Sequence, residues 1–151
     1  MKKNAKAFTL AEMLIVVLII SAFTFIAVPR MGMATIFRGK SEIAANQIAS
    51  AIRLCRTLAI DNAAVNKQGY SLNMTGSGQY SGFQIVNLQT NQIVKSETIP
   101  TSVSCKGTGN FRFNPLGSRT DGNGILMVTG GGKNYKLSVI SSTGMVRCEK
   151  N

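Results

Sequence analysis

The strongest constraint on this chain is an apolar run over residues 7–28 that contains one charged residue, Glu12. As a helix, residues 7–29 would be about 34 Å long at about 1.5 Å per residue, which is enough to cross a bilayer. A carboxylate is costly in hydrocarbon, so an acidic residue there is a functional-site hypothesis. We expect its partner to be an amine on a neighbouring copy of a similar chain; the alternative is that Glu12 snorkels to the headgroups.

Three lysines, Lys2, Lys3 and Lys6, precede the apolar run. A basic leader of this kind marks either a secretory signal peptide or a helix anchored with its N-terminus in the cytoplasm. The run is longer than the roughly 7–15 apolar residues of a signal peptide, which favours the anchored helix. Pro29 is expected to end or kink that helix, because proline cannot donate a backbone hydrogen bond.

The charge and the residue types limit the chemistry of the chain. It has 17 basic and 6 acidic residues and a net charge of +11, which favours anionic partners, but the basic residues are scattered. Histidine is absent, and Cys55, Cys105 and Cys148 have no CxxC spacing. Without the commonest general base and metal ligand, we expect no enzymatic activity, no metal and no cofactor.

The remainder predicts one globular domain over residues 30–151. Small and apolar residues spaced by three and four predict an amphipathic helix over residues 41–63, below a looser joint at Gly32 and Gly39. They are Ala44, Ile48, Ile52, Cys55 and Ala59. Short apolar runs between turn residues then predict antiparallel strands at 70–74, 83–88, 92–94, 111–113, 125–129, 135–140 and 145–148. The predicted fold is α+β, a long N-terminal helix with a transmembrane half and an amphipathic half, packed on an antiparallel β-sheet.

The segment Phe8-Thr9-Leu10-Ala11-Glu12, directly after the basic leader, resembles the N-terminal signature of type IV pilins and pseudopilins. The resemblance implies a prepilin leader over residues 1–7, a transmembrane helix over 8–29 and a pilin-like domain in the periplasm or cell exterior. A prepilin peptidase would cut between Ala7 and Phe8 and methylate the new N-terminus. The Phe8 amine of a neighbouring subunit would then meet Glu12. Most members have Gly before the cut, where this chain has Ala7.

Three further segments are similar to H-type (FimT-like) minor pseudopilins: residues 56–60, 111–117 and 141–147. This similarity implies a non-catalytic subunit of a type II secretion pseudopilus or a type IV pilus. Before assembly it would cross the bacterial inner membrane once, with its N-terminus in the cytoplasm. Its partners would be other pilins or pseudopilins, the prepilin peptidase and the membrane.

The alternative function is DNA binding during uptake for natural transformation. Some FimT-like members bind DNA through a C-terminal Gly-Arg-x-Arg motif, and the matching positions here are Gly144, Met145, Val146 and Arg147. The first Arg of the motif is missing. Further phosphate contacts would come from Lys133, Lys136 and Lys150. The other interpretation is a structural β-turn with a solvated Arg147.

The periplasmic placement that the resemblance implies would permit disulfides. Cys105 and Cys148 both lie at edges of predicted β segments and are the preferred pair, whereas Cys55 lies on the helical apolar stripe as a buried thiol. Another pair, or no disulfide at all, stays open.

Overall fold

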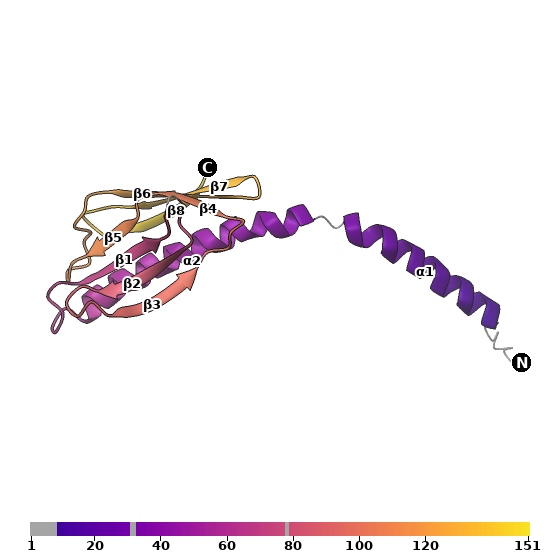
Figure 1. Ribbon diagram of the computed structural model, residues 1–151, viewed down its shortest axis with the longest axis horizontal. Helices are drawn as coiled ribbons and strands as arrows, with labels where there is room; N and C mark the ends of the chain where they lie inside the picture. The colour runs from indigo at the N-terminus through magenta and orange to yellow at the C-terminus, as the bar shows by residue number, and fades with distance from the viewer. Residues whose placement is uncertain (1–8, 31–32, 78) are drawn as a thin grey trace, which may run out of the picture. The chain divides into compact units, whose positions relative to one another are not determined.

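The computed structural model describes residues 9–30, 33–77 and 79–151. The chain divides into two compact units, Met1–Thr35 and Ile36–Asn151. Their elements are labelled in Figure 1.

The first unit is built around one helix, α1, Leu10–Arg30. Its side chains are exposed from Leu10 to Phe25, including large apolar ones such as Ile15 and Phe23. Within the described part of the chain, no helix meets the length and hydropathy needed to cross a membrane. α1 ends one residue after Pro29, and residues 31–32 lie outside the description.

The second helix, α2, spans Met33–Asp61, and it begins earlier than the predicted helix over residues 41–63. The looser joint predicted at Gly39 is wrong, since α2 passes through Gly39 without a break. One helical glycine costs only about 1 kcal/mol relative to alanine, which the packing further along α2 offsets. The predicted apolar stripe from Ala44 to Ala59 is confirmed, because all five of its side chains are buried.

Eight strands follow α2 and form two four-stranded antiparallel sheets rather than the single sheet expected. The first sheet has the order β3-β2-β1-β5 and the second has the order β4-β6-β7-β8. The strands are β1 Tyr70–Thr75, β2 Gly82–Asn87, β3 Ile93–Thr98, β4 Ser104–Gly107, β5 Asn110–Phe113, β6 Gly124–Gly130, β7 Lys133–Val139 and β8 Val146–Lys150. Every predicted strand is present, and β4 is the one strand that the sequence pattern does not predict.

The chain passes from the second sheet to the first between β4 and β5. Thr108 donates its backbone N–H to Ile125 of β6, and Gly109 accepts a bond from Met74 of β1. The two sheets are therefore tied together at this crossing.

One core fills the space between α2 and both sheets. Ile48 and Ile52 of α2 are fully buried together with Leu72 and Phe83 of the first sheet and Leu137 of the second. Polar contacts at the edge of the core also join α2 to both sheets. Gln47 of α2 donates a hydrogen bond to Glu97 of β3 in the first sheet. Glu42 of α2 accepts a 2.9 Å bond from Tyr135 of β7 in the second sheet. α2 consequently holds both sheets, and in Figure 1 it runs along the strands.

Candidate functional site

The start of α1 is closed by a reciprocal hydrogen-bond pair between Thr9 and Glu12. Thr9 donates from its backbone N–H and from its hydroxyl to Oε2 of Glu12, both at 3.0 Å, and the Glu12 backbone N–H donates to Oγ1 of Thr9 at 3.2 Å. This is a capping box, which satisfies N–H groups that have no partner within the helix. The pattern Thr-x-x-Glu before an apolar run predicts this cap, whereas the two roles expected for Glu12, pairing with an amine or snorkelling to the headgroups, do not include it.

The cap leaves part of the Glu12 carboxylate available. Both of its hydrogen bonds enter Oε2, and Oε1 accepts none from the described residues. The carboxylate is exposed. Ala7 and Phe8, the predicted cleavage pair and the source of the predicted amine, lie outside the described residues.

One side of α1 presents a shallow apolar hollow. It is lined by Leu10, Met13, Leu14, Val17, Leu18 and Ser21. These positions recur at spacings of three and four, so they form one stripe of the helix surface. A stripe of this kind is suited to packing against another helix or against lipid.

The predicted DNA contacts do not share one face of the second sheet. Lys136 and Arg147 alternate with the buried residues of β7 and β8, so they point away from the core. Lys133 is in phase with buried Tyr135 and makes an ion pair of 3.7 Å with Glu42 of α2. Lys150 is paired with Tyr135 in the β-ladder, on the same phase as Lys133.

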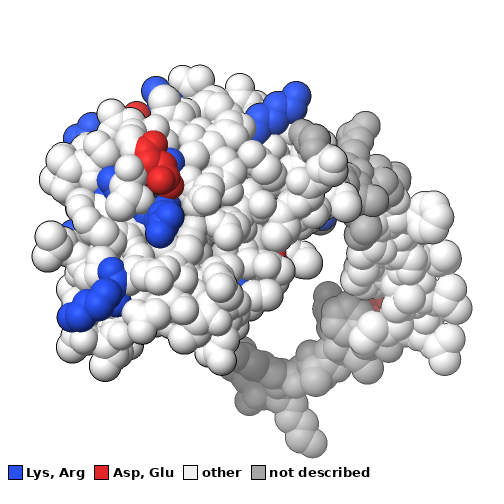
Figure 2. Space-filling model, turned by 60° about the vertical axis from the view of Figure 1, so that its left-hand side comes forward, with Lys and Arg blue, Asp and Glu red and all other residues white. Residues whose placement is uncertain are grey.

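The positive charge of Arg147 also has an acidic side chain beside it. Its Nη1 lies 3.9 Å from Oε1 of Glu149, and both side chains are mostly exposed. On the face shown in Figure 2 the basic side chains lie apart from one another rather than in one patch. The predicted DNA contacts therefore lie on two faces of the second sheet, with Lys136 and Arg147 on one and Lys133 and Lys150 on the other.

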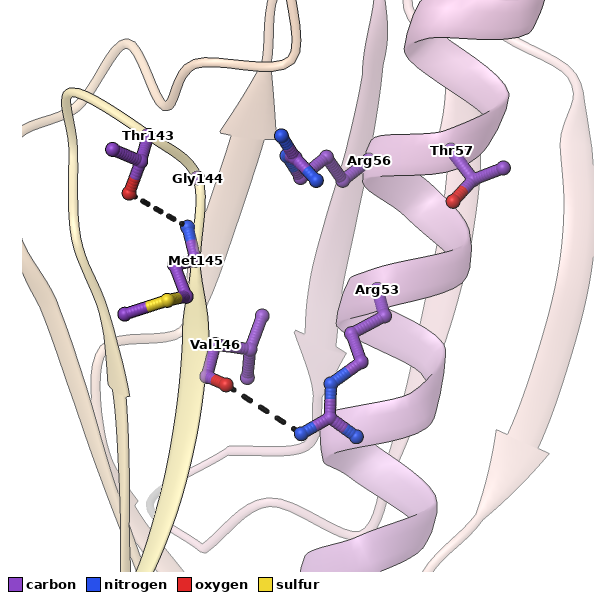
Figure 3. A pocket seen from close by; sticks show the side chains of 7 residues that line it. All are labelled: Arg53, Arg56, Thr57, Thr143, Gly144, Met145 and Val146. Carbon is purple, nitrogen blue, oxygen red and sulfur yellow. Dashed lines mark hydrogen bonds between the residues drawn. The ribbon is translucent and has the colours of Figure 1, made fainter.

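A hollow lies between the Gly144 turn and α2. The hollow has a volume of about 480 Å³ and is lined by Arg53, Arg56, Thr57, Thr143, Gly144, Met145 and Val146. Figure 3 shows the Arg53 and Arg56 side chains extending from α2 toward the turn. The sequence indicates the Gly144 turn as a candidate site but not these two arginines, which come from a part of the chain far from it.

Arg56 is held between two backbone segments. Its Nε donates to the Gly117 carbonyl at 3.0 Å. A side chain at Gly144 would overlap that same carbonyl and would place its Cβ 2.9 Å from Nε of Arg56. Gly144 also has a φ of 65°, which L-residues with side chains rarely adopt. The turn therefore needs glycine so that Arg56 can lie against it.

The three cysteines are free thiols. Cys105 lies on β4 and Cys148 on β8, the two outer strands of the second sheet. Strands in a sheet are about 4.8 Å apart, so three strand spacings separate these residues by roughly 14 Å. A disulfide needs Cα atoms within about 7 Å. The Cys105–Cys148 bond predicted from the sequence is incompatible with this topology.

Burial governs the acidity of the cysteines. It raises the pKa of Cys55 to about 12 and that of Cys105 to about 11. Burial also raises the pKa of the half-buried Cys148, and the nearby Arg53 guanidinium acts in the opposite direction. At neutral pH all three are thiols rather than thiolates.

Comparison with known proteins gives one finding, and it concerns the N-terminal segment. Residues 2–28 match the prokaryotic N-terminal methylation motif. A search of curated proteins and a search of solved structures each returned no match.

The matched segment contains the basic leader, the predicted cleavage pair, the Thr9–Glu12 cap and most of α1. Beyond it the structure has an α+β unit with antiparallel sheets, which is consistent with a pilin-like fold. The chain thus carries a type IV pilin-like prepilin signal, which supports its placement among pilins and pseudopilins that a prepilin peptidase processes and that assemble with one another.

Proposed function

We propose that this protein is a minor pilin or pseudopilin of the H-type (FimT-like) class, a non-catalytic subunit of a type II secretion pseudopilus or a type IV pilus. It would require no cofactor. The peptidase would cut between Ala7 and Phe8, and the mature subunit would cross the inner membrane once, with α1 as its anchor. Assembly would then join α1 to the helices of neighbouring subunits.

The observation that carries this proposal is the start of α1, which lies inside the matched motif. Glu12 caps its own helix through Oε2, while Oε1 remains available to a second donor. The methylated amine of Phe8 on a neighbouring subunit would be such a donor. In a low-dielectric surrounding that ion pair offsets the desolvation of both groups and penalises a wrong axial register.

The experiment compares two substitutions that separate the charge of Glu12 from the cap, since glutamine can still accept the bonds from Thr9. Glu12→Gln loses the negative charge, whereas Thr9→Ala loses the hydroxyl and keeps the carboxylate. Each variant is expressed in the native host, and its amount in sheared filaments is measured relative to its amount in the membrane fraction. We expect Glu12→Gln to reduce incorporation at least tenfold and Thr9→Ala to reduce it less than threefold.

Mass spectrometry of the assembled protein tests the processing step separately. We expect a mature chain that begins at N-methylated Phe8. Assembled material that retains Met1, or Glu12→Gln protein that is incorporated as well as the unsubstituted chain, contradicts the proposal.

A second candidate is DNA binding during uptake, and the observation that favours it is the pair of arginines beside the Gly144 turn. DNA affinity should then fall steeply with salt, because phosphate contacts release counterions. Fluorescence anisotropy with labelled duplex, at several salt concentrations, measures this. An affinity unchanged in Arg53→Gln would contradict this candidate, and an affinity unchanged in Arg147→Ala would remove that residue from the binding site.

A further inference from the structure

We propose that the hollow between α2 and the Gly144 turn is a binding site for a phosphate group. Arg53 and Arg56 are three residues apart on α2, so they lie on one face of the helix. Both line the hollow, and Figure 3 shows both side chains directed to the turn side of α2. This site is distinct from the surface around Arg147, whose side chain is on the outward phase of β8, and it does not depend on assembly.

The two arginines have no acidic partner in the described part of the chain. The ion pairs found there join Lys95 to Glu97, Lys133 to Glu42 and Arg147 to Glu149. The chain as a whole has 6 acidic residues against 17 basic ones. Two neighbouring guanidinium groups repel each other unless an anion lies between them. The hollow therefore has an uncompensated positive charge.

The Arg56 guanidinium is also held in place before any ligand arrives, while Arg53 has one weaker contact. Arg56 uses Nε to bond Gly117 at 3.0 Å, which leaves the N–H groups of both terminal nitrogens for a ligand. Arg53 makes one long bond of 3.5 Å, from Nη2 to the Val146 carbonyl. Binding thus costs less side-chain entropy than it would for two freely rotating arginines.

The turn adds a neutral donor to the same hollow. The Thr143 hydroxyl oxygen accepts a 3.2 Å bond from the Met145 backbone N–H, as Figure 3 shows. Its own hydrogen remains available to an acceptor. Thr57 of α2 also lines the hollow with a hydroxyl.

These donors fit the chemistry of phosphate. A guanidinium group binds a phosphate through two parallel N–H···O bonds, and a tetrahedral phosphate has enough oxygens to bond two guanidinium groups and a hydroxyl together. The volume of about 480 Å³ leaves room for the rest of a phosphate ester. The phosphate could belong to free inorganic phosphate or to a nucleic-acid backbone, and the experiment separates these two sources.

The test uses the full chain in a nonionic detergent and follows two-dimensional NMR spectra during addition of inorganic phosphate. Sodium chloride at equal ionic strength serves as the reference. We expect saturable shifts at the Gly144 amide and at the Nε–H groups of both arginines. Arg53→Gln should weaken the affinity at least fivefold, which corresponds to the loss of one charge-assisted contact.

Lys106→Gln is the matched control, since Lys106 is an exposed cation on β4 without an ion pair among the described residues. The affinity of the Lys106→Gln variant for phosphate should stay within twofold of that of the unsubstituted chain. Shifts that do not saturate, or that are equal in Arg53→Gln and the unsubstituted chain, would overturn the proposal.

A short single-stranded oligonucleotide identifies the source. If it shifts the same groups and Arg53→Gln weakens its binding, the site takes a phosphate of the nucleic-acid backbone. If inorganic phosphate alone shifts them, the site takes the free ion. Oligonucleotide binding that is equally strong in Arg53→Gln shows that nucleic acid binds elsewhere and limits the hollow to the free ion.

Discussion

At the scale of single residues, Gly144 couples a backbone conformation to the position of a charged side chain. Its φ of 65° places it in the left-handed region. The absence of a Cβ lets the Gly117 carbonyl and the Arg56 stem approach the turn. Three segments that are far apart in the sequence therefore meet at one glycine.

We predict that Gly144→Ala lowers the free energy of unfolding by about 2–3 kcal/mol, through backbone strain and the displacement of Arg56. Gly132→Ala is the matched control. Gly132 has a similar φ of +76° but no atom within 4 Å of the added Cβ, so only the backbone cost of about 1 kcal/mol applies. Urea denaturation measures both. Equal losses in the two variants would show that the contact with Arg56 contributes nothing.

Local patterns and distant contacts differ in how well the sequence predicts them. The Thr9–Glu12 cap joins residues that are three apart, and its motif is readable from the sequence. The bond from Arg56 to Gly117 joins residues 61 apart, and no local pattern encodes it. The hollow beside the turn could therefore be found only after the fold had brought α2 and the turn together.

At the scale of elements, the apolar periodicity predicts α2 and most strands, but it does not predict how the strands are distributed. β4 was missed because Ser104-Cys105-Lys106-Gly107 has only one apolar position. This short strand completes the second sheet by pairing with β6. Without β4 the remaining strands suggest one sheet, and the separation of Cys105 from Cys148 cannot be recognised.

The sheet order leads to a prediction for thiol reactivity. The folded chain is treated with a thiol-specific reagent at about pH 8, which is below the ordinary thiol pKa of about 8.5. We predict that Cys148 is modified slowly and that Cys55 and Cys105 are not modified. The reasons are that Cys55 and Cys105 are fully buried and that their pKa values are raised to about 12 and about 11. Absorbance of the released chromophore, followed by peptide mass spectrometry, gives the order of reaction.

The same pKa values fix the pH range in which stability changes. A raised thiol pKa contributes a stability that is fully present below the unfolded-state value of 9.0 and is lost as the pH rises toward the folded values. Unfolding in urea should therefore become easier above about pH 9. A chain that keeps only one free thiol after purification under oxidising conditions, with Cys105 and Cys148 joined in its peptide map, would contradict the separation of these two cysteines.

At the scale of the whole molecule, the core belongs to one unit. The buried apolar residues that the structure describes extend from Ala44 to Val146, all within the unit Ile36–Asn151. None of them comes from α1. The unit therefore contains the apolar contacts that a cooperative fold requires.

We predict that residues 36–151 alone unfold cooperatively, with a Tm within about 4 °C of the value for the full chain in a nonionic detergent. Differential scanning calorimetry of both proteins makes the comparison, and circular dichroism reports whether the helix and sheet signals are lost together. A truncated chain without a cooperative transition would show that residues before Ile36 complete the fold.

The exposed apolar surface of α1 carries a free-energy cost wherever the helix meets water. Side chains such as Leu14, Leu18 and Phe23 have more than half of their surface uncovered, and each apolar Å² left in water costs about 25 cal/mol. Any transfer of the helix from one location to the next must therefore be direct, with the new apolar neighbour in contact before the old one is released.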